Sequence, residues 1–437
     1  MSTSLKRTLG TTDLTLLVIG NVIGSGIFLV PSSVLKQSGG SVPVASSVWL
    51  VGGVLSLLGA LSYGELGAME RGSGGLYSYI RDGFGALPAF LYGWTLFFVI
   101  GTGTIATLAV AAANYMGQFT ELSPIAKKVI STGLIAMMAI INVRGTRESA
   151  SVQNVATGIK VLAILAMSVL FFALGTGSEA PVAAATPRFS AVGLSIISVL
   201  WAYEGWQYVT FVAAESTNPQ RALPRAIALG TTALIAIYLL ANFGYLAALG
   251  PDRVAASERV ASEAVSQVLG PAAGSAIALA IIVSMYSAAH ATVITAPRVY
   301  FSMAQDGLFF KRLAEVHPRY GTPALAIITS CAWAAILALT GTFEQLLTYV
   351  VFVGWIFYAL GAAAVIALRI KQPHAPCPFR VPGYPFTPLL FVLAAAAIVL
   401  NTIIEQPTQS AIGIGVVLLG VPAYLGWRRT ARSGATG

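Results

Sequence analysis

Two short segments of the chain combine glycine, polar and aromatic residues inside long apolar runs, and they are best suited to bind a ligand. They read Gly20-Asn-Val-Ile-Gly-Ser-Gly-Ile-Phe28 and Trp201-Ala-Tyr-Glu-Gly-Trp-Gln-Tyr208. Each glycine weakens a helix by about 1 kcal/mol relative to alanine. A carboxylate in the middle of an apolar span costs roughly 2.5–3.5 kcal/mol. The first segment therefore predicts a local break, and Glu204 in the second is expected to face a cavity or a partner instead of lipid.

A broken helix offers binding groups of both signs. The N-terminus of a half-helix presents unpaired N–H groups and a positive dipole end to an anion, while freed carbonyls suit an ammonium. An α-amino acid carries both charges, so such breaks favour zwitterionic substrates. Two structural alternatives stay open: Gly20 and Gly24 form a GxxxG pair suited to close helix packing, and Glu204 suits a buried helix junction.

The elements that carry these segments are membrane spans. Of the 437 residues, 56% are hydrophobic and 9% are charged, against roughly a quarter charged in a soluble domain. Apolar runs of about 20 residues, enough to cross a bilayer, recur along the chain. The composition predicts an all-α integral membrane protein, with residues 1–437 forming one transmembrane domain. Twelve spans are predicted near 13–36, 44–69, 84–117, 125–143, 150–175, 191–216, 223–249, 265–305, 323–341, 345–370, 386–403 and 410–427.

The net charge of +9 is distributed unevenly along these spans. With the N-terminus inside, eighteen of the 25 basic residues fall in cytoplasmic segments and six in outer ones, while Lys160 lies within a helix. This asymmetry follows the positive-inside rule and predicts that both termini are cytoplasmic. It also argues against nucleic acid as a partner.

Several classes of function lack their signatures. The two cysteines, Cys331 and Cys377, have no metal-ligand spacing, and none of the seven lysines follows a glycine as a P-loop requires. His290, the one histidine in a predicted span, has no evident catalytic or metal-binding partner. We therefore expect neither an enzyme nor a cofactor. A channel fits the breaks less well than an occluded site does, whereas a membrane sensor of amino acids would share the same binding residues.

The spacing of the two broken spans predicts a repeat. Breaks in the first and sixth spans, five helices apart, are typical of an inverted repeat. Residues 13–175 would form the first half and 191–370 the second, with the last two helices at 386–427.

Motifs along nearly the whole chain resemble the amino acid-polyamine-organocation superfamily and, within it, the L-type amino acid transporter branch. They are Val22–Pro31, Ser73–Tyr79, Trp201–Trp206 with the following Asn218-Pro219, the Arg298 to Gly307 region, and Phe379–Pro385. The resemblance implies the LeuT-type five-plus-five fold, in which helices 1 and 6 are discontinuous. It also implies alternating access and transport of L-amino acids.

The same resemblance implies roles for individual residues. The backbone around Ile23, Gly24, Ser25, Gly26 and Ile27 would hold the α-carboxylate, and carbonyls in the Trp201, Ala202, Tyr203, Glu204 and Gly205 segment would take the α-amino group. Trp201 would act as an aromatic gate. Glu204, Gln207, Tyr208 and Trp355 would line the side-chain pocket. The acid at Glu204 departs from members that handle large neutral amino acids and resembles those that also accept cationic ones.

Lys160 matches a helix 5 lysine of sodium-independent members. It lies about nine residues into its span, roughly 14 Å deep at 1.5 Å per residue, so its ammonium can stand where other carriers hold sodium. Its expected partners are carbonyls of the first break and the Ser287 hydroxyl. The alternatives are a lysine that reaches the interface, or a proton carrier, a role that His290 could share. Glu65 is expected to pair with a basic residue in a cytoplasmic gate.

Together these patterns predict a sodium-independent exchanger of neutral amino acids, with cationic ones as a further class, in the inner cell membrane. A proton-coupled symporter is the alternative. Animal members of the branch join a glycoprotein through a cysteine between helices 3 and 4. The corresponding loop, Gln118–Pro124, has none, so no disulfide-linked subunit is expected beside the lipid bilayer and the substrates.

Overall fold

A computed structural model describes residues 9–69, 74–144, 149–177 and 189–433. Within these ranges the chain is helical, and one isolated parallel bridge joins Leu9 to Ser216. The basic residues Lys6, Arg7, Arg71, Arg147 and Arg188, which contribute to the predicted orientation, lie outside the described ranges, as does Ser73 of one motif. The helices are α1 (Thr11–Val22), α2 (Gly26–Gln37), α3 (Val42–Ala68), α4 (Leu76–Phe84), α5 (Ala86–Thr95), η1 (Leu96–Ile100), α6 (Gly101–Met116), α7 (Pro124–Arg144), α8 (Ser149–Leu174), α9 (Phe189–Ala202), η2 (Trp206–Glu215), α10 (Pro219–Leu249), α11 (Pro251–Ala256), α12 (Val260–Leu269), α13 (Pro271–Thr295), α14 (Pro297–Gln305), η3 (Lys311–Ala314), α15 (Ala324–Thr340), α16 (Phe343–Lys371), α17 (Phe386–Glu405) and α18 (Pro407–Ser433).

Helices occupy all the predicted apolar runs. Among the described residues, nine helical stretches are long and apolar enough to cross a membrane, and the bent pair α1 and α2 makes a tenth. The other two predicted runs contain shorter helices. The run at 191–216 is divided between α9 and η2, and α15 has 17 residues. The architecture is therefore that of a multi-pass membrane protein.

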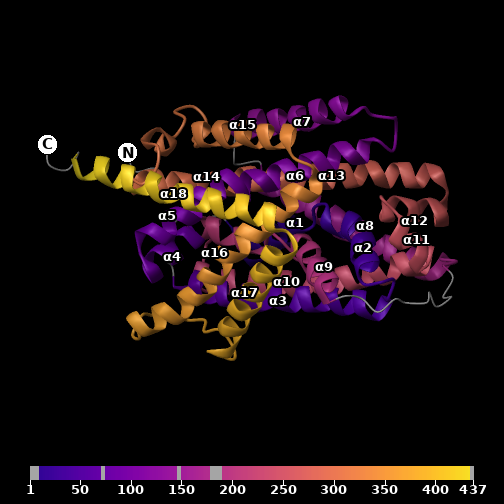
Figure 1. Ribbon diagram of the computed structural model, residues 1–437, viewed down its shortest axis with the longest axis horizontal. Coiled ribbons are helices and arrows are strands. Elements are labelled where there is room, and N and C mark those ends of the chain that lie inside the picture. The colour runs from indigo at the N-terminus through magenta and orange to yellow at the C-terminus, as the bar shows by residue number, and fades with distance from the viewer. Residues whose placement is uncertain (1–8, 70–73, 145–148, 178–188, 434–437) are drawn as a thin grey trace.

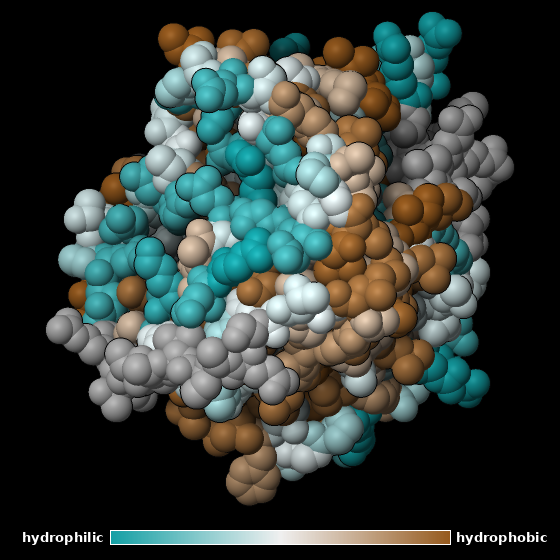
Figure 2. Space-filling view, turned by 90° about the vertical axis from the view of Figure 1, so that its right-hand side faces the viewer, coloured by the Kyte–Doolittle hydropathy of each residue, from teal (hydrophilic) through white to brown (hydrophobic). Residues whose placement is uncertain are grey.

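Most of the long helices run along the longest axis of the molecule (Figure 1). Helices α11 and α12 lie at one end of that axis, and the C-terminal end of α18 lies at the other. Figure 2 shows the end that carries α11 and α12, where hydrophilic residues form a band and hydrophobic residues lie beside it. Large apolar side chains such as Leu162, Val169 and Leu279 are more than half exposed, as expected of surfaces that face lipid.

The mixed charges at 252–263 predict a solvated outer loop between α10 and α13, and the structure differs from this prediction. The segment forms the short helices α11 and α12, in which Val260, Ala261 and Ala264 are fully buried. The apolar positions of α12 are difficult to recognise in the sequence, because their side chains are small and charged residues at 252–263 lie between them. Helix α12 packs against α13 and α10, so this segment is a folded cap.

The two broken spans lie at the centre of the bundle. Helix α1 packs against α10, α8 and α13, and α2 packs against α9. Gly20 permits the close approach of α1 to α8, because an added Cβ would lie 2.2 Å from Thr157 Oγ1. Gly24, by contrast, lies in the break itself. Of the two glycines in the GxxxG pair, Gly20 therefore serves close helix packing and Gly24 belongs to the helix break.

Candidate ligand-binding site

The first break separates α1 from α2 by a bend of 48°. Helix α1 ends at Val22, and the Gly24 N–H turns back to donate to the Val22 carbonyl at 2.8 Å. Helix α2 begins at Gly26, and the Phe28 and Leu29 N–H groups donate to the carbonyl of its N-cap Ser25 at 3.1 Å. The Gly26 and Ile27 N–H groups precede these bonds and have no acceptor within the helix. These groups, with the dipole of α2 behind them, suit a carboxylate.

The second break separates α9 from the 3-10 helix η2. Residues Tyr203, Glu204 and Gly205 connect the two, and Gly205 has a φ of +126°. That left-handed conformation is accessible to glycine and strained for other residues. Backbone carbonyls at the end of α9 are consequently released from helical hydrogen bonding.

The two breaks touch each other at the centre of the molecule. A Cβ added to Gly26 would lie 2.3 Å from the Ala202 Cα, and one added to Gly205 would lie 3.0 Å from the Asn21 carbonyl. Glycine at both positions is therefore required for the backbones to meet. The N-terminus of α2 thus lies next to the C-terminus of α9.

Tyr238, on α10, joins the two breaks and was missed in the sequence. Its buried hydroxyl lies 3.1 Å from the Val22 carbonyl and 3.0 Å from the Ala202 carbonyl. The Ala202 carbonyl keeps a second lone pair for a ligand. A tyrosine at the middle of an apolar helix was the available signal, because a buried phenol needs a hydrogen-bond partner.

Lys160 lies directly under the first break. Its Nζ donates to the Ile23 carbonyl at 3.2 Å, and Ser284 Oγ donates to the same oxygen at 3.4 Å. The predicted hydroxyl partner differs, because Ser287 donates instead to Gln153 Oε1 at 3.2 Å. His290 stacks on Tyr286 with ring centroids 6.2 Å apart.

Glu204 is buried within a hydrogen-bonded cluster. Its Oε1 accepts a hydrogen bond from Gln207 Nε2 at 2.5 Å and another from the Tyr358 hydroxyl. Gln207 in turn accepts from the Gly205 N–H at 3.2 Å. The described residues provide no cation within salt-bridge distance of Glu204. The carboxyl is thus fixed by neutral donors beside the second break.

Trp201 covers the first break from the α9 side. Its indole Nε1 donates to Ser25 Oγ at 3.1 Å, and its ring meets Phe343 edge-on with centroids 6.4 Å apart. The indole is 5% exposed.

A small cavity of about 20 Å³ lies between the breaks. That is close to the space one water molecule needs, so a larger ligand would require the cavity to expand. Six residues that the sequence assigned to the site line it, together with four to which the sequence assigned no individual role. The predicted ones are Gly24, Ser25, Gly26, Trp201, Glu204 and Tyr208, and the additional ones are Asn21, Val22, Thr104 and Leu108.

The remaining predicted site residues lie around this cavity instead of lining it. Trp355 packs against Phe391 with ring centroids 5.1 Å apart, and Tyr203 packs against Trp49. Ile23 and Ile27 are fully buried in the first break and its following turn. Thr104 and Leu108 come from α6, which follows the π-helical turn η1, a feature that often marks functional sites.

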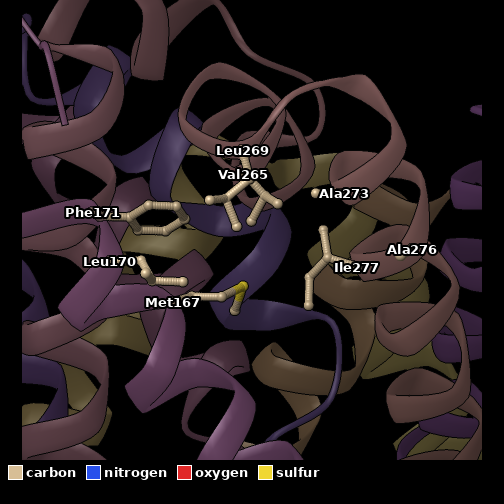
Figure 3. A pocket seen from close by; sticks show the side chains of 8 residues that line it. All are labelled: Met167, Leu170, Phe171, Val265, Leu269, Ala273, Ala276 and Ile277. Carbon is tan, nitrogen blue, oxygen red and sulfur yellow. The ribbon is translucent and has the colours of Figure 1, made fainter. Parts of the chain in front are cut away.

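A larger cavity of about 290 Å³ lies elsewhere, between α8, α12 and α13. Figure 3 shows its lining, which consists of Met167, Leu170, Phe171, Val265, Leu269, Ala273, Ala276 and Ile277. All these side chains are apolar. The cavity lacks the polar groups that a zwitterion requires, so size alone does not identify the site.

Polar contacts close the end opposite α11 and α12. Glu65 forms a bidentate pair with Arg369 at 2.7 Å and accepts from the Val381 N–H at 2.6 Å. This gives Glu65 the basic partner that the sequence predicted. Arg298 pairs with Glu215 at 2.8 Å, at the end of η2.

A second contact at this end joins α4 to the segment after α14. Arg81 Nη1 and the Tyr77 hydroxyl both donate to Asp306 Oδ2 at 2.7 Å. Burial raises the pKa of the Tyr77 hydroxyl above its ordinary value, and the hydrogen bond to Asp306 raises it further. Tyr77 therefore remains a neutral donor.

Comparison with known proteins places this architecture among transport proteins. The family model described as amino acid permease matches residues 9–421. The chain is 32% identical over 432 residues to the serine/threonine exchanger SteT of Bacillus subtilis (strain 168), covering 98% of each chain. It is 30% identical over 433 residues to the large neutral amino acids transporter small subunit 2 of Mus musculus, covering 96% of this chain and 81% of that one. It is also 31% identical over 417 residues to the cystine/glutamate transporter of Homo sapiens, covering 93% and 82%.

Proposed function

The chain belongs to the amino acid permease family, and we propose that it is a sodium-independent secondary transporter that exchanges L-amino acids across the inner cell membrane by alternating access. One observation carries this proposal: the two breaks meet beside a small cavity, with the N-terminus of α2 against the C-terminus of α9. The partial positive charge at the N-terminus of a helix and the partial negative charge at the C-terminus of another are complementary to the carboxylate and ammonium of an α-amino acid.

The names of the relatives support transport and, for one of them, exchange. They describe an exchanger of serine and threonine, a transporter of large neutral amino acids and a transporter of cystine and glutamate. These names describe transporters, so we assign this chain to transport and not to an enzyme. Their different substrates do not decide which amino acid this chain carries.

Sodium independence is inferred from Lys160. Its ammonium donates to the Ile23 carbonyl in the first break, where a bound cation would otherwise be needed to compensate the free carbonyl. The fixed charge of a lysine provides that compensation without a diffusible ion. We accordingly propose a five-plus-five inverted repeat over residues 13–175 and 191–370, with one break in each half.

The transporter is proposed to work without a disulfide-linked subunit and with both termini in the cytoplasm. Cys331 is buried in α15, and Cys377 lies in the segment between α16 and α17. Neither lies between α6 and α7, where Gln118–Pro124 contains no cysteine.

Purified protein in liposomes tests the proposal. Vesicles loaded with unlabelled serine, leucine, alanine, arginine or glutamate are given labelled amino acid outside, with and without sodium. Internal substrate should stimulate uptake at least tenfold over unloaded vesicles, and sodium should have no effect. Uptake into unloaded vesicles driven by a pH gradient would instead establish proton symport. Saturable binding without any uptake would indicate a sensor.

We further propose that Glu204 admits cationic amino acids. Its carboxyl lines the cavity and has no cationic partner in the described part of the chain. Replacing it by Glu204→Gly or by the isosteric Glu204→Gln should weaken arginine competition about tenfold while alanine exchange persists. Arginine competition that is unchanged in both variants would remove the cationic class from the substrate range.

A further inference from the structure

One polar side chain in the cavity has no partner. Asn21 precedes the last residue of α1 and is 8% exposed, and both its Nδ2 and Oδ1 are buried without a hydrogen bond in the described structure. A buried polar group without a hydrogen bond destabilises the folded protein. An amide with both ends unpaired, on a residue that lines a cavity, is therefore a candidate for binding a ligand group.

Apart from the Tyr208 hydroxyl, which is also buried without a hydrogen bond in the described structure, the other polar side chains that line the cavity are already engaged. Ser25 Oγ accepts from Trp201, Thr104 Oγ1 donates to the Ile100 carbonyl at 2.7 Å, and Glu204 Oε1 accepts two hydrogen bonds. Asn21 is thus the lining amide whose donor and acceptor are both available. Its place next to the second break is also fixed, because the Asn21 backbone lies against Gly205.

The chemistry of the amide limits the ligand group. A carboxamide presents an acceptor oxygen and donor hydrogens side by side, so its complement is a group that donates and accepts together. A hydroxyl meets that requirement with one heavy atom, which suits a cavity of about 20 Å³ better than a carboxamide does.

We propose that Asn21 recognises the side-chain hydroxyl of the transported amino acid, and so makes serine and threonine preferred substrates over their deoxy analogues. This inference rests on the proposed function, since it assumes that an amino acid occupies the cavity. Asn21 acts on specificity and not on the α-carboxylate or α-amino group, which the two breaks hold.

Matched substrates isolate the hydroxyl. Serine and alanine differ by one oxygen, as do threonine and α-aminobutyrate. The ratio of their half-saturation constants in exchange reports the hydroxyl alone, because any general damage to the carrier affects both members of a pair. The wild type should prefer the hydroxylated member of each pair.

Asn21→Ala should reduce that preference about fivefold, which corresponds to one hydrogen bond of about 1 kcal/mol. Asn401→Ala is the matched control, since Asn401 Nδ2 is also buried and unpaired but lies on α17 outside the cavity. The control should leave both ratios unchanged. Ratios that are unchanged in Asn21→Ala, or equally changed in Asn401→Ala, would overturn the inference.

A second variant covers the case in which Asn21→Ala fails to fold. Asn21→Ser keeps a small polar group, and stabilisation of the purified protein by serine relative to alanine can be measured without transport. The apparent affinity for serine relative to alanine, measured by thermal stabilisation, should fall about two- to fivefold in this variant. An unchanged relative affinity would overturn the inference. Failure of the wild type to exchange any amino acid would contradict the proposed function instead, so the two failures are distinguishable.

Discussion

At the scale of single residues, Lys160 and Tyr238 hold the backbone of the site from outside the cavity. Both contact carbonyls that the breaks release: Lys160 contacts Ile23, while Tyr238 contacts Val22 and Ala202. Lys160 was found in the sequence because a charge within an apolar run is conspicuous. Tyr238 was not found in the sequence, because its hydroxyl reaches the two carbonyls only when α10 is packed against both breaks.

Removing the Lys160 ammonium should impair exchange more than folding. Charge-assisted hydrogen bonds contribute about 1.5–3 kcal/mol, so Lys160→Met is expected to reduce the exchange rate roughly 10- to 100-fold. Exchange in liposomes measures this, and size-exclusion chromatography verifies folding. Lys128→Met, at an exposed position near the start of α7, is the control and should exchange like the wild type. A fully active Lys160→Met would contradict the role assigned to the ammonium.

Tyr238→Phe removes one hydroxyl and should loosen both breaks together. We expect a loss of about 1 kcal/mol in stability and a lower maximal exchange rate, with a smaller effect on half-saturation. Tyr245→Phe is an apt control, because Tyr245 is equally buried on the same helix and its hydroxyl has no partner among the described residues. Equal effects of the two changes would show that Tyr238 only fills space.

At the scale of elements, the breaks could be predicted and their partners could not. Glycine clusters and a carboxylate in an apolar run are local signals, so Gly24, Gly26 and Glu204 indicated from the sequence where the two breaks lie. The position of Trp355 depends on how α16 and α17 pack, and it faces Phe391 instead of the cavity. The buried face of α12 was missed because its apolar positions are alanine and valine among charges.

The segment before α1 is paired with the end of η2. Leu9 N–H donates to the Glu215 carbonyl, and Thr217 N–H donates to the Leu9 carbonyl, both at 3.0 Å. Bridge partners in parallel pairing are close enough for a disulfide. A Leu9→Cys, Ser216→Cys pair, in a background with Cys331→Ser and Cys377→Ser, should therefore cross-link upon oxidation.

The cross-link should stop exchange, because it ties α1 to η2 and prevents this end from opening. Reduction should restore the original rate, and each single-cysteine variant should be insensitive to oxidant. Exchange at the unmodified rate by fully cross-linked protein would mean that these two elements stay together throughout the cycle.

At the scale of the whole molecule, composition predicted the membrane class and the charge asymmetry predicted an orientation. The family membership agrees with the predicted membrane class. The orientation can be tested with a native residue, since Cys377 is partly exposed between α16 and α17 whereas Cys331 is buried.

An impermeant maleimide should label Cys377 only after the cells are permeabilised. Glu121→Cys, in an exposed position between α6 and α7, should be labelled in intact cells when placed in a Cys377→Ser background. Burial, and then Glu65, raise the pKa of the Cys377 thiol. Less thiolate is therefore present at neutral pH than in an ordinary cysteine, and labelling should accelerate as the pH rises. Labelling of Cys377 in intact cells would reverse the orientation.

The contact between Gly26 and Ala202 also restricts how the protein can change over generations. A side chain at position 26 would collide with the Ala202 Cα and not only with its methyl group, so shortening residue 202 offers no relief. Genetic suppression of a substitution there would require a shift of a whole backbone segment. In a library randomised at position 26 and selected for growth on an imported amino acid, glycine should be the residue recovered.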